Sequence, residues 1–103
     1  MKLDHIAINV ANIEKSVKWY RDNLDARVLY KDKSWAILNC HGANIALTLS
    51  KQHPPHIGFE LDSMKEFPNP ELVKYHRDGV AYLYVDDIDG NTIEYVYRPG
   101  RKS

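Results

Sequence analysis

Apolar and polar residues alternate one by one in two separate stretches of the chain. Over residues 3–10 one face carries the large apolar residues at positions 6, 8 and 10 and the other carries His5, Ala7 and Asn9, and over residues 56–61 the apolar residues occupy positions 57, 59 and 61. A period of two is typical of strands that bury one face. Each stretch carries a histidine near its start on the polar face, His5 in the first and His56 in the second. The pattern predicts two similar strands whose histidines point away from the apolar side.

A helical period follows the first strand. Asn12 is a good N-cap, and the next apolar positions recur at i, i+4, i+7 and i+11: Ile13, Val17, Tyr20 and Leu24. This spacing predicts an amphipathic helix over 13–24. Further strands are expected over 26–31, 34–39 and 44–50, with a turn at His41-Gly42. The first half of the chain therefore has the order βαβββ.

The second half repeats this order in a shorter form. Its first strand begins at His56, but residues 64–70 contain two prolines where the helix should stand, so we expect a loop with at most a short helical turn. Strands return over 80–86 and 91–97 around an Asp-Gly turn. The predicted fold class is α+β: one domain over 1–103 made of paired βαβββ modules, 1–51 and 52–103, the second lacking most of its helix.

The missing helix would leave one face of the second half uncovered. The apolar residues concerned are Ile57, Phe59, Leu61, Leu83 and Val85. We expect them to be exposed unless another chain packs against them, which predicts a homodimer.

Composition narrows the class of partner. Fourteen basic and fourteen acidic side chains in 103 residues cancel, which gives no electrostatic case for binding nucleic acid or a membrane surface. Cys40 is the only cysteine, so no disulfide forms within the chain. This cysteine usage is typical of proteins in a reducing compartment. With no signal-like start and no apolar run of about 20 residues, we expect a cytoplasmic protein with a small-molecule substrate.

Candidate metal ligands stand at equivalent places in the two halves. The runs Asn44–Leu49 and 91–96 close the halves, with Ala46 as the counterpart of Glu94. Of the four equivalent positions, His5, His56 and Glu94 therefore carry metal-binding side chains. Two imidazoles and one carboxylate leave three positions of an octahedral ion open. We expect one divalent metal per chain, with Fe(II) as the first choice and Mn(II), Zn(II) and Ni(II) as alternatives.

The His-Ile strand starts, the βαβββ order and the closing run 87–94 resemble the vicinal oxygen chelate superfamily of glyoxalases, bleomycin-resistance proteins and extradiol dioxygenases. The resemblance covers nearly the whole chain. Glyoxalase-like members usually place a fourth ligand at the position matched to Ala46, and alanine cannot bind metal. The remaining set resembles the iron site of extradiol ring-cleaving dioxygenases, which implies an Fe(II)-dependent oxidoreductase acting on a catecholic aromatic substrate.

Residues 76–94 are similar to the extradiol signature, except that Lys74, just before it, and Ile88 within it stand where other residues are usual. The resemblance implies catalytic roles for His76, Tyr84 and His41, the last lying fifteen residues before His56. Tyr84 would hydrogen-bond a substrate oxygen, and His41 would move a proton. Simpler readings stay open, with His41 as a turn residue, His76 as a loop residue and Tyr84 as a wall of the sheet.

Two other functions remain open at this point. A lyase or isomerase of the glyoxalase kind needs a metal but no oxygen, and Ala46 weighs against it. A metal-free binding protein of the bleomycin-resistance kind needs only an aromatic cleft, and the three ligand-type residues weigh against that. Metal analysis separates the binder from both enzymes.

Overall fold

The computed structural model describes residues 1–100. It divides the chain into two compact units: the first unit is His5–His56, and the second unit joins Met1–Asp4 to the segment that starts at Ile57. The boundaries fall within strand β1 (Lys2–Val10) and at the first residue of strand β5 (His56–Glu60). No helix among the described residues has the length and apolar composition needed to cross a membrane.

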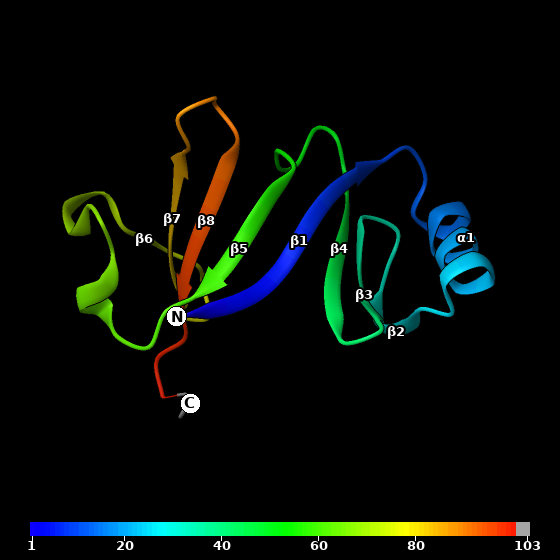
Figure 1. The fold of residues 1–103 in the computed structure, drawn as a ribbon, viewed down its shortest axis with the longest axis horizontal. Helices are drawn as coiled ribbons and strands as arrows, with labels where there is room; N and C mark the ends of the chain where they lie inside the picture. Colours follow the sequence, from blue (N-terminus) through cyan, green and yellow to red (C-terminus); the bar gives the residue numbers. More distant parts are fainter. Residues whose placement is uncertain (101–103) are drawn as a thin grey trace. The chain divides into compact units, whose positions relative to one another are not determined.

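The first unit contains one helix and the sheet order β2-β3-β4-β1 (Figure 1). After β1 come α1 (Ile13–Leu24), β2 (Arg27–Lys31), β3 (Trp35–Cys40) and β4 (Ala43–Leu49). Strands β2, β3 and β4 are antiparallel neighbours, whereas β1 runs parallel to β4. The predicted βαβββ order is confirmed, and the helix has the predicted bounds. A register shift in β2 between Val28 and Tyr30 was not foreseen.

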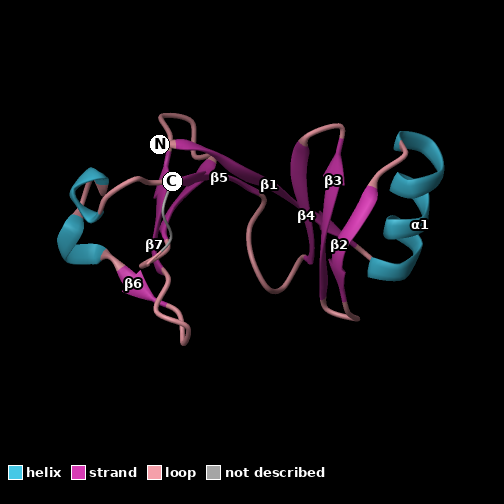
Figure 2. Cartoon of the chain, turned by 90° about the horizontal axis from the view of Figure 1, so that it is seen from below, coloured by secondary structure: helices cyan, strands magenta, loops and turns pink. Residues whose placement is uncertain are grey.

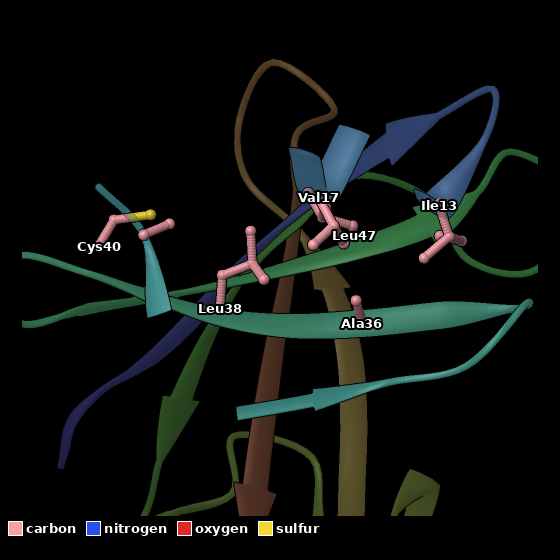
Figure 3. Close-up of a cluster of buried hydrophobic side chains, with 7 residues drawn as sticks. Ile13, Val17, Ala36, Leu38, Cys40 and Leu47 are labelled. Atoms are coloured by element: carbon pink, nitrogen blue, oxygen red, sulfur yellow. The ribbon is translucent and has the colours of Figure 1, made fainter. Parts of the chain in front are cut away.

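Helix α1 forms where its cap and its apolar period predict it. The Asn12 side chain accepts a hydrogen bond from the Lys15 N–H at 2.8 Å, and Asp25 ends the helix in the left-handed region with φ of 53°. The helix lies on one side of β2–β4 (Figure 2). Ile13 and Val17 pack there into a core whose other members come from the strands or from just before β2 (Figure 3): Ala26, Ala36, Leu38, Cys40 and Leu47. The helix therefore covers one face of this sheet, and His5 lies on the opposite face.

The turn between β3 and β4 has the form that two-residue hairpin loops require. His41 and Gly42 both have positive φ, 53° and 95° respectively. A type I′ turn needs this geometry at both positions, and glycine adopts it without strain. The predicted His41-Gly42 turn is confirmed.

The second unit repeats the strand order without a long helix. Its strands β6 (Lys74–Tyr75), β7 (Ala81–Asp86), β8 (Thr92–Tyr97) and β5 stand in the order β6-β7-β8-β5, which matches β2-β3-β4-β1. Two 3₁₀ helices, Met64–Glu66 and Pro70–Leu72, replace the α-helix as the prolines predicted. The short strand β6 was not predicted, because two residues show no alternation.

The covering of the second unit corrects one prediction. Leu61 is 3% exposed and Leu83 is 6% exposed, so the expectation that both lie open was wrong. Phe67, which lies between the two 3₁₀ helices, is itself buried and packs in one cluster with Leu61 and Leu83. The proline-broken segment thus supplies an aromatic ring in place of a helix face. Ile57 remains 40% exposed, as expected.

Candidate metal centre

His5 of β1 and His56 of β5 meet in the first unit. The Nε2 atoms of His5 and His56 are 3.0 Å apart, and the ring planes are nearly perpendicular, at 86°. His56 is buried and His5 is half-buried. Because His5 lies on the polar face of β1, the pair faces away from the helix-covered core. The predicted convergence of these two side chains is what the structure shows.

A main-chain carbonyl sets the proton position on His56. Its Nδ1 atom lies 2.8 Å from the carbonyl oxygen of Pro54. A carbonyl only accepts, so Nδ1 carries the hydrogen, and in the neutral ring the lone pair is on Nε2, the atom that faces His5. Metal-binding histidines commonly donate the other ring N–H to a carbonyl in this way. His56 is therefore in the ligand form toward His5.

The spacing of the pair fits two ligands of one ion. Two nitrogen atoms about 2.1 Å from an ion and at a right angle to each other lie about 3.0 Å apart, whereas a tetrahedral angle separates them by about 3.4 Å. The observed 3.0 Å matches the right angle. Without an ion, the same distance is a hydrogen bond from the His5 Nε2–H to the His56 lone pair. The two donor atoms are therefore close enough to be neighbouring ligands of one divalent metal.

Asn9 ties the strand of His5 to the segment that leads into His56. Its side-chain Nδ2 donates to the Thr48 hydroxyl at 2.9 Å and to the His53 carbonyl at 3.0 Å. Sequence reasoning gave Asn9 no role. Its signal was weak: a polar residue on the same face of the strand as His5.

Glu94 lies in the second unit, on β8 opposite Tyr84 of β7. Its side chain is buried, and the Tyr84 hydroxyl donates a hydrogen bond to it. Burial, and next the negative charge of Glu94, raise the pKa of Tyr84 above its usual range. The phenol therefore keeps its proton at neutral pH and holds the carboxylate by donation.

The predicted residues His76 and Tyr84 belong to one row of contacts with Glu94. The ring of His76 stacks on Tyr82, with centroids 4.0 Å apart and planes 10° from parallel. Tyr82 meets Tyr84 edge to face at 5.9 Å. This row runs from an exposed histidine to a buried carboxylate within the second unit.

Ala46 and Glu94 occupy matching places in the two units. Each lies three residues before the end of its strand, β4 and β8 respectively. Each is also buried outside the apolar cluster of its unit, whereas the next residues, Leu47 and Tyr95, belong to or pack against those clusters. The sequence-based pairing of Ala46 with Glu94 therefore agrees with the place of each residue relative to the end of its strand and with the sheet face on which it lies.

His41 has a structural contact of its own. Its Nε2 lies 2.8 Å from the carbonyl oxygen of Leu24, at the end of α1, and so donates to it. This bond fastens the β3–β4 turn to the helix. The acid–base role of His41 stays a prediction.

A charge cluster in the second unit was not predicted. The Arg98 guanidinium bonds both carboxylate oxygens of Asp4, at 3.1 and 3.2 Å, and a Glu60 oxygen at 3.1 Å. Lys2 adds an ion pair to Glu60 at 3.5 Å. Glu60 is buried, so these partners offset the cost of its burial. The partners lie up to 94 residues apart, a separation that local patterns do not reveal.

The family model for the Glyoxalase/Bleomycin resistance protein/Dioxygenase superfamily matches residues 2–92. The chain belongs to this superfamily. Metallothiol transferase FosB from Staphylococcus haemolyticus is 30% identical, over 89% of this chain and 80% of that protein. The same named protein from Staphylococcus epidermidis is equally similar, at 30% over the same shares.

Solved structures show the same fold. Methylmalonyl-CoA epimerase from Mycobacterium tuberculosis has a TM-score of 0.70 at 18% identity, covering 93% of this chain and 87% of that one. A superfamily member from Vibrio splendidus 12B01 has a TM-score of 0.71 at 12% identity, covering 94% of this chain and all of that one. The relatives with functional names are enzymes, which supports an enzyme here. They give no specific support to an extradiol dioxygenase.

Proposed function

We propose that this superfamily member is an enzyme that uses one divalent metal, bound by His5, His56 and Glu94. The observation that carries the proposal is the convergence of the two histidine Nε2 atoms at 3.0 Å, with the His56 lone pair directed by the Pro54 carbonyl. Glu94 is proposed as the third ligand on two grounds, its place in the repeat and its burial as a carboxylate. Buried carboxylates are retained where a cation or hydrogen bonds compensate them.

A divalent metal bound to this set would act as a Lewis acid toward an oxygen atom of the substrate. The residues of the chain prepare the set. His56 is fixed in the ligand tautomer, and the Tyr84 hydroxyl restrains the Glu94 carboxylate by donating to it. Two imidazoles and one carboxylate leave positions open for a chelating small molecule.

Thiol transfer is the reaction we propose first. Its support is the 30% identity to metallothiol transferases over 89% of the chain. In such a step the thiol sulfur forms a bond to an electrophilic carbon, the carbon–oxygen bond at that carbon breaks, and the thiol proton ends on the released oxygen. The substrate class is therefore a small molecule with a metal-binding oxygen on its reactive carbon, together with a low-molecular-weight thiol.

Thiol consumption tests this reaction. The protein loaded with Mn(II), Zn(II), Ni(II) or Fe(II) is incubated without oxygen, with a low-molecular-weight thiol and a panel of oxygen-bearing electrophiles, and free thiol is titrated. We expect metal-dependent loss of thiol that His56→Ala abolishes and His53→Ala leaves unchanged. Absence of thiol loss with every metal and electrophile would overturn thiol transfer.

Ring cleavage of a catechol is the second candidate. The residue types favour it, because two histidines and one carboxylate with open positions are typical of Fe(II) oxygenases. The test is oxygen uptake by the Fe(II)-loaded protein across a catechol panel, with a yellow product. His41→Ala should lower kcat by about 10²–10⁴-fold if His41 moves a proton. Thiol transfer proceeds without oxygen and ring cleavage does not, so the two assays separate the candidates.

The remaining alternatives make different predictions. A glyoxalase-like lyase or isomerase would turn over a hemithioacetal with metal and without oxygen. A binding protein of the bleomycin-resistance kind would hold an aromatic molecule equally well after metal is removed. Either result, combined with no thiol transfer and no oxygen uptake, would replace both proposed reactions.

A further inference from the structure

We propose that Asn9 is a positioning residue for His56, acting through the main chain of residues 53–55. The inference rests on the proposed metal-binding role of His56. Asn9 contacts neither histidine ring in any hydrogen bond described above. Its effect on the site would pass through the carbonyl of His53 and then through that of Pro54.

The amide of Asn9 has both of its hydrogens committed. One points to the Thr48 hydroxyl at 2.9 Å and the other to the His53 carbonyl at 3.0 Å. The carbonyl only accepts, so the nitrogen side of the amide must face it. Thr48 also lies within 3.4 Å of the Ile8 carbonyl, where its hydroxyl donates. The contact therefore fixes the His53 carbonyl against β1 and β4.

The segment after His53 has few free torsions. Two consecutive prolines, Pro54 and Pro55, fix their own φ near −65°, and the residue before a proline is restricted to extended conformations. His53 and Pro54 both precede a proline. Fixing the position of the His53 carbonyl therefore also restricts the position of the Pro54 carbonyl. That carbonyl holds the His56 Nδ1–H at 2.8 Å and so directs Nε2 toward His5.

Asn9→Asp tests this role because it keeps the shape and removes the donor. The new carboxylate oxygen would face the His53 carbonyl, and two acceptors repel each other. Asn39→Asp is the matched control. Asn39 donates to the Asn44 side chain at 3.0 Å on the same sheet, in a bond that does not involve residues 53–56. Both variants add one negative charge, so a general charge effect would appear in both.

Two readouts are needed, one without metal and one with it. In the metal-free protein, ¹⁵N NMR of the imidazoles reports which nitrogen of His56 carries the hydrogen. We expect the Nδ1–H form in the native protein and in Asn39→Asp, and a mixture of both forms in Asn9→Asp. Competition with a chromophoric chelator for Mn(II) should show affinity about tenfold weaker in Asn9→Asp alone, the lower end of the 10–100-fold loss typical for outer partners of metal ligands.

A further variant keeps the test decisive. If Asn9→Asp does not fold, Asn9→Ala removes the same donor without adding charge and should give the same shift. A native His56 tautomer together with native Mn(II) affinity in Asn9→Ala or Asn9→Asp would overturn the positioning role. If the native protein binds no metal at all, the proposed function fails, while the NMR comparison still decides the role of Asn9.

Discussion

The carboxylate of Asp32 accepts four hydrogen bonds in the turn between β2 and β3. One oxygen takes the Tyr30 hydroxyl at 2.6 Å, and the other takes the Ser34 N–H, the Ser34 hydroxyl and the Trp35 N–H at 2.7, 2.8 and 3.0 Å. These donors, led by the Tyr30 hydroxyl, hold the pKa of Asp32 well below its usual range. The ionised form is therefore the one that stabilises this turn.

Asp32→Asn should reveal that contribution through its dependence on pH. A lowered pKa in the folded state gives stability that is present above the unfolded value of about 3.9 and is lost as pH falls toward the folded value. We expect Asp32→Asn to melt below the native protein at pH 7, with the gap shrinking from about pH 4 downward. Calorimetry from pH 7 to pH 2 measures this. A gap of constant size over that range would contradict the assignment, and Asp78→Asn, which loses a carboxylate that accepts one N–H from Val80, is the control.

At the scale of residues, the sequence indicated the candidate ligands but not the residues that position them. His5 and His56 stand out because each lies near the start of a strand of the same pattern, and Glu94 because its counterpart is Ala46. Asn9 could not be found in this way, since its partner is a main-chain carbonyl 44 residues away. A main-chain group carries no signature in the sequence.

The segment between β5 and β6 shows how a short element replaces a longer one. Phe67 is 3% exposed and packs with Leu61, Ala81 and Leu83. A capping box at Ser63 and Glu66 shapes the turn that presents it, and the Phe67 N–H bonds the Met64 carbonyl at 3.3 Å. The second unit thus covers its apolar cluster with one aromatic ring.

Phe67→Ala should destabilise the protein by about 3–5 kcal/mol, because it removes a buried ring and leaves a cavity. Chemical denaturation monitored by circular dichroism measures the loss. Leu72→Ala in the same segment, where the side chain is 57% exposed, should change stability by no more than about 0.5 kcal/mol. Equal effects of the two substitutions would show that Phe67 does not cover the cluster.

Among the elements, those with both a cap and a period were predicted best. Helix α1 combines Asn12 with apolar residues at helical spacing, and its bounds came out as predicted. The cover by Phe67 was missed because a proline-broken segment has no period from which to infer a buried face. The bulge in β2 and the two-residue strand β6 were also missed, because neither produces a repeating pattern of apolar positions.

At the scale of the whole molecule, the two units repeat one strand order, but only the first has a long helix that covers its sheet. The order β2-β3-β4-β1 of the first unit and β6-β7-β8-β5 of the second are the same. The repeat places Ala46 and Glu94 at matching positions, and the proposed ligand set is asymmetric because only the glutamate of the two has a metal-binding side chain. The fold class followed from the alternating pattern, whereas the reaction did not, because one ligand set serves several chemistries.

We also propose a homodimer at this scale. Its support is the exposure of two apolar side chains of the second unit, Leu3 at 53% and Ile57 at 40%. Light scattering at high micromolar concentration should give twice the mass of the 11.9 kDa chain. Ile57→Lys should then shift the mass toward the monomer, while Lys51→Glu, in the first unit, should not. A monomer mass for the native protein would contradict the proposal.

Metal content is the most direct measure of the central claim. The native protein, reconstituted with a divalent metal and freed of excess, should contain about one ion per chain by elemental analysis. His5→Ala, His56→Ala and Glu94→Ala should each lower that content sharply, and His53→Ala should retain it, since His53 contributes a main-chain carbonyl to this region. Full occupancy in all three ligand variants, or a native protein that retains no metal, would contradict the account.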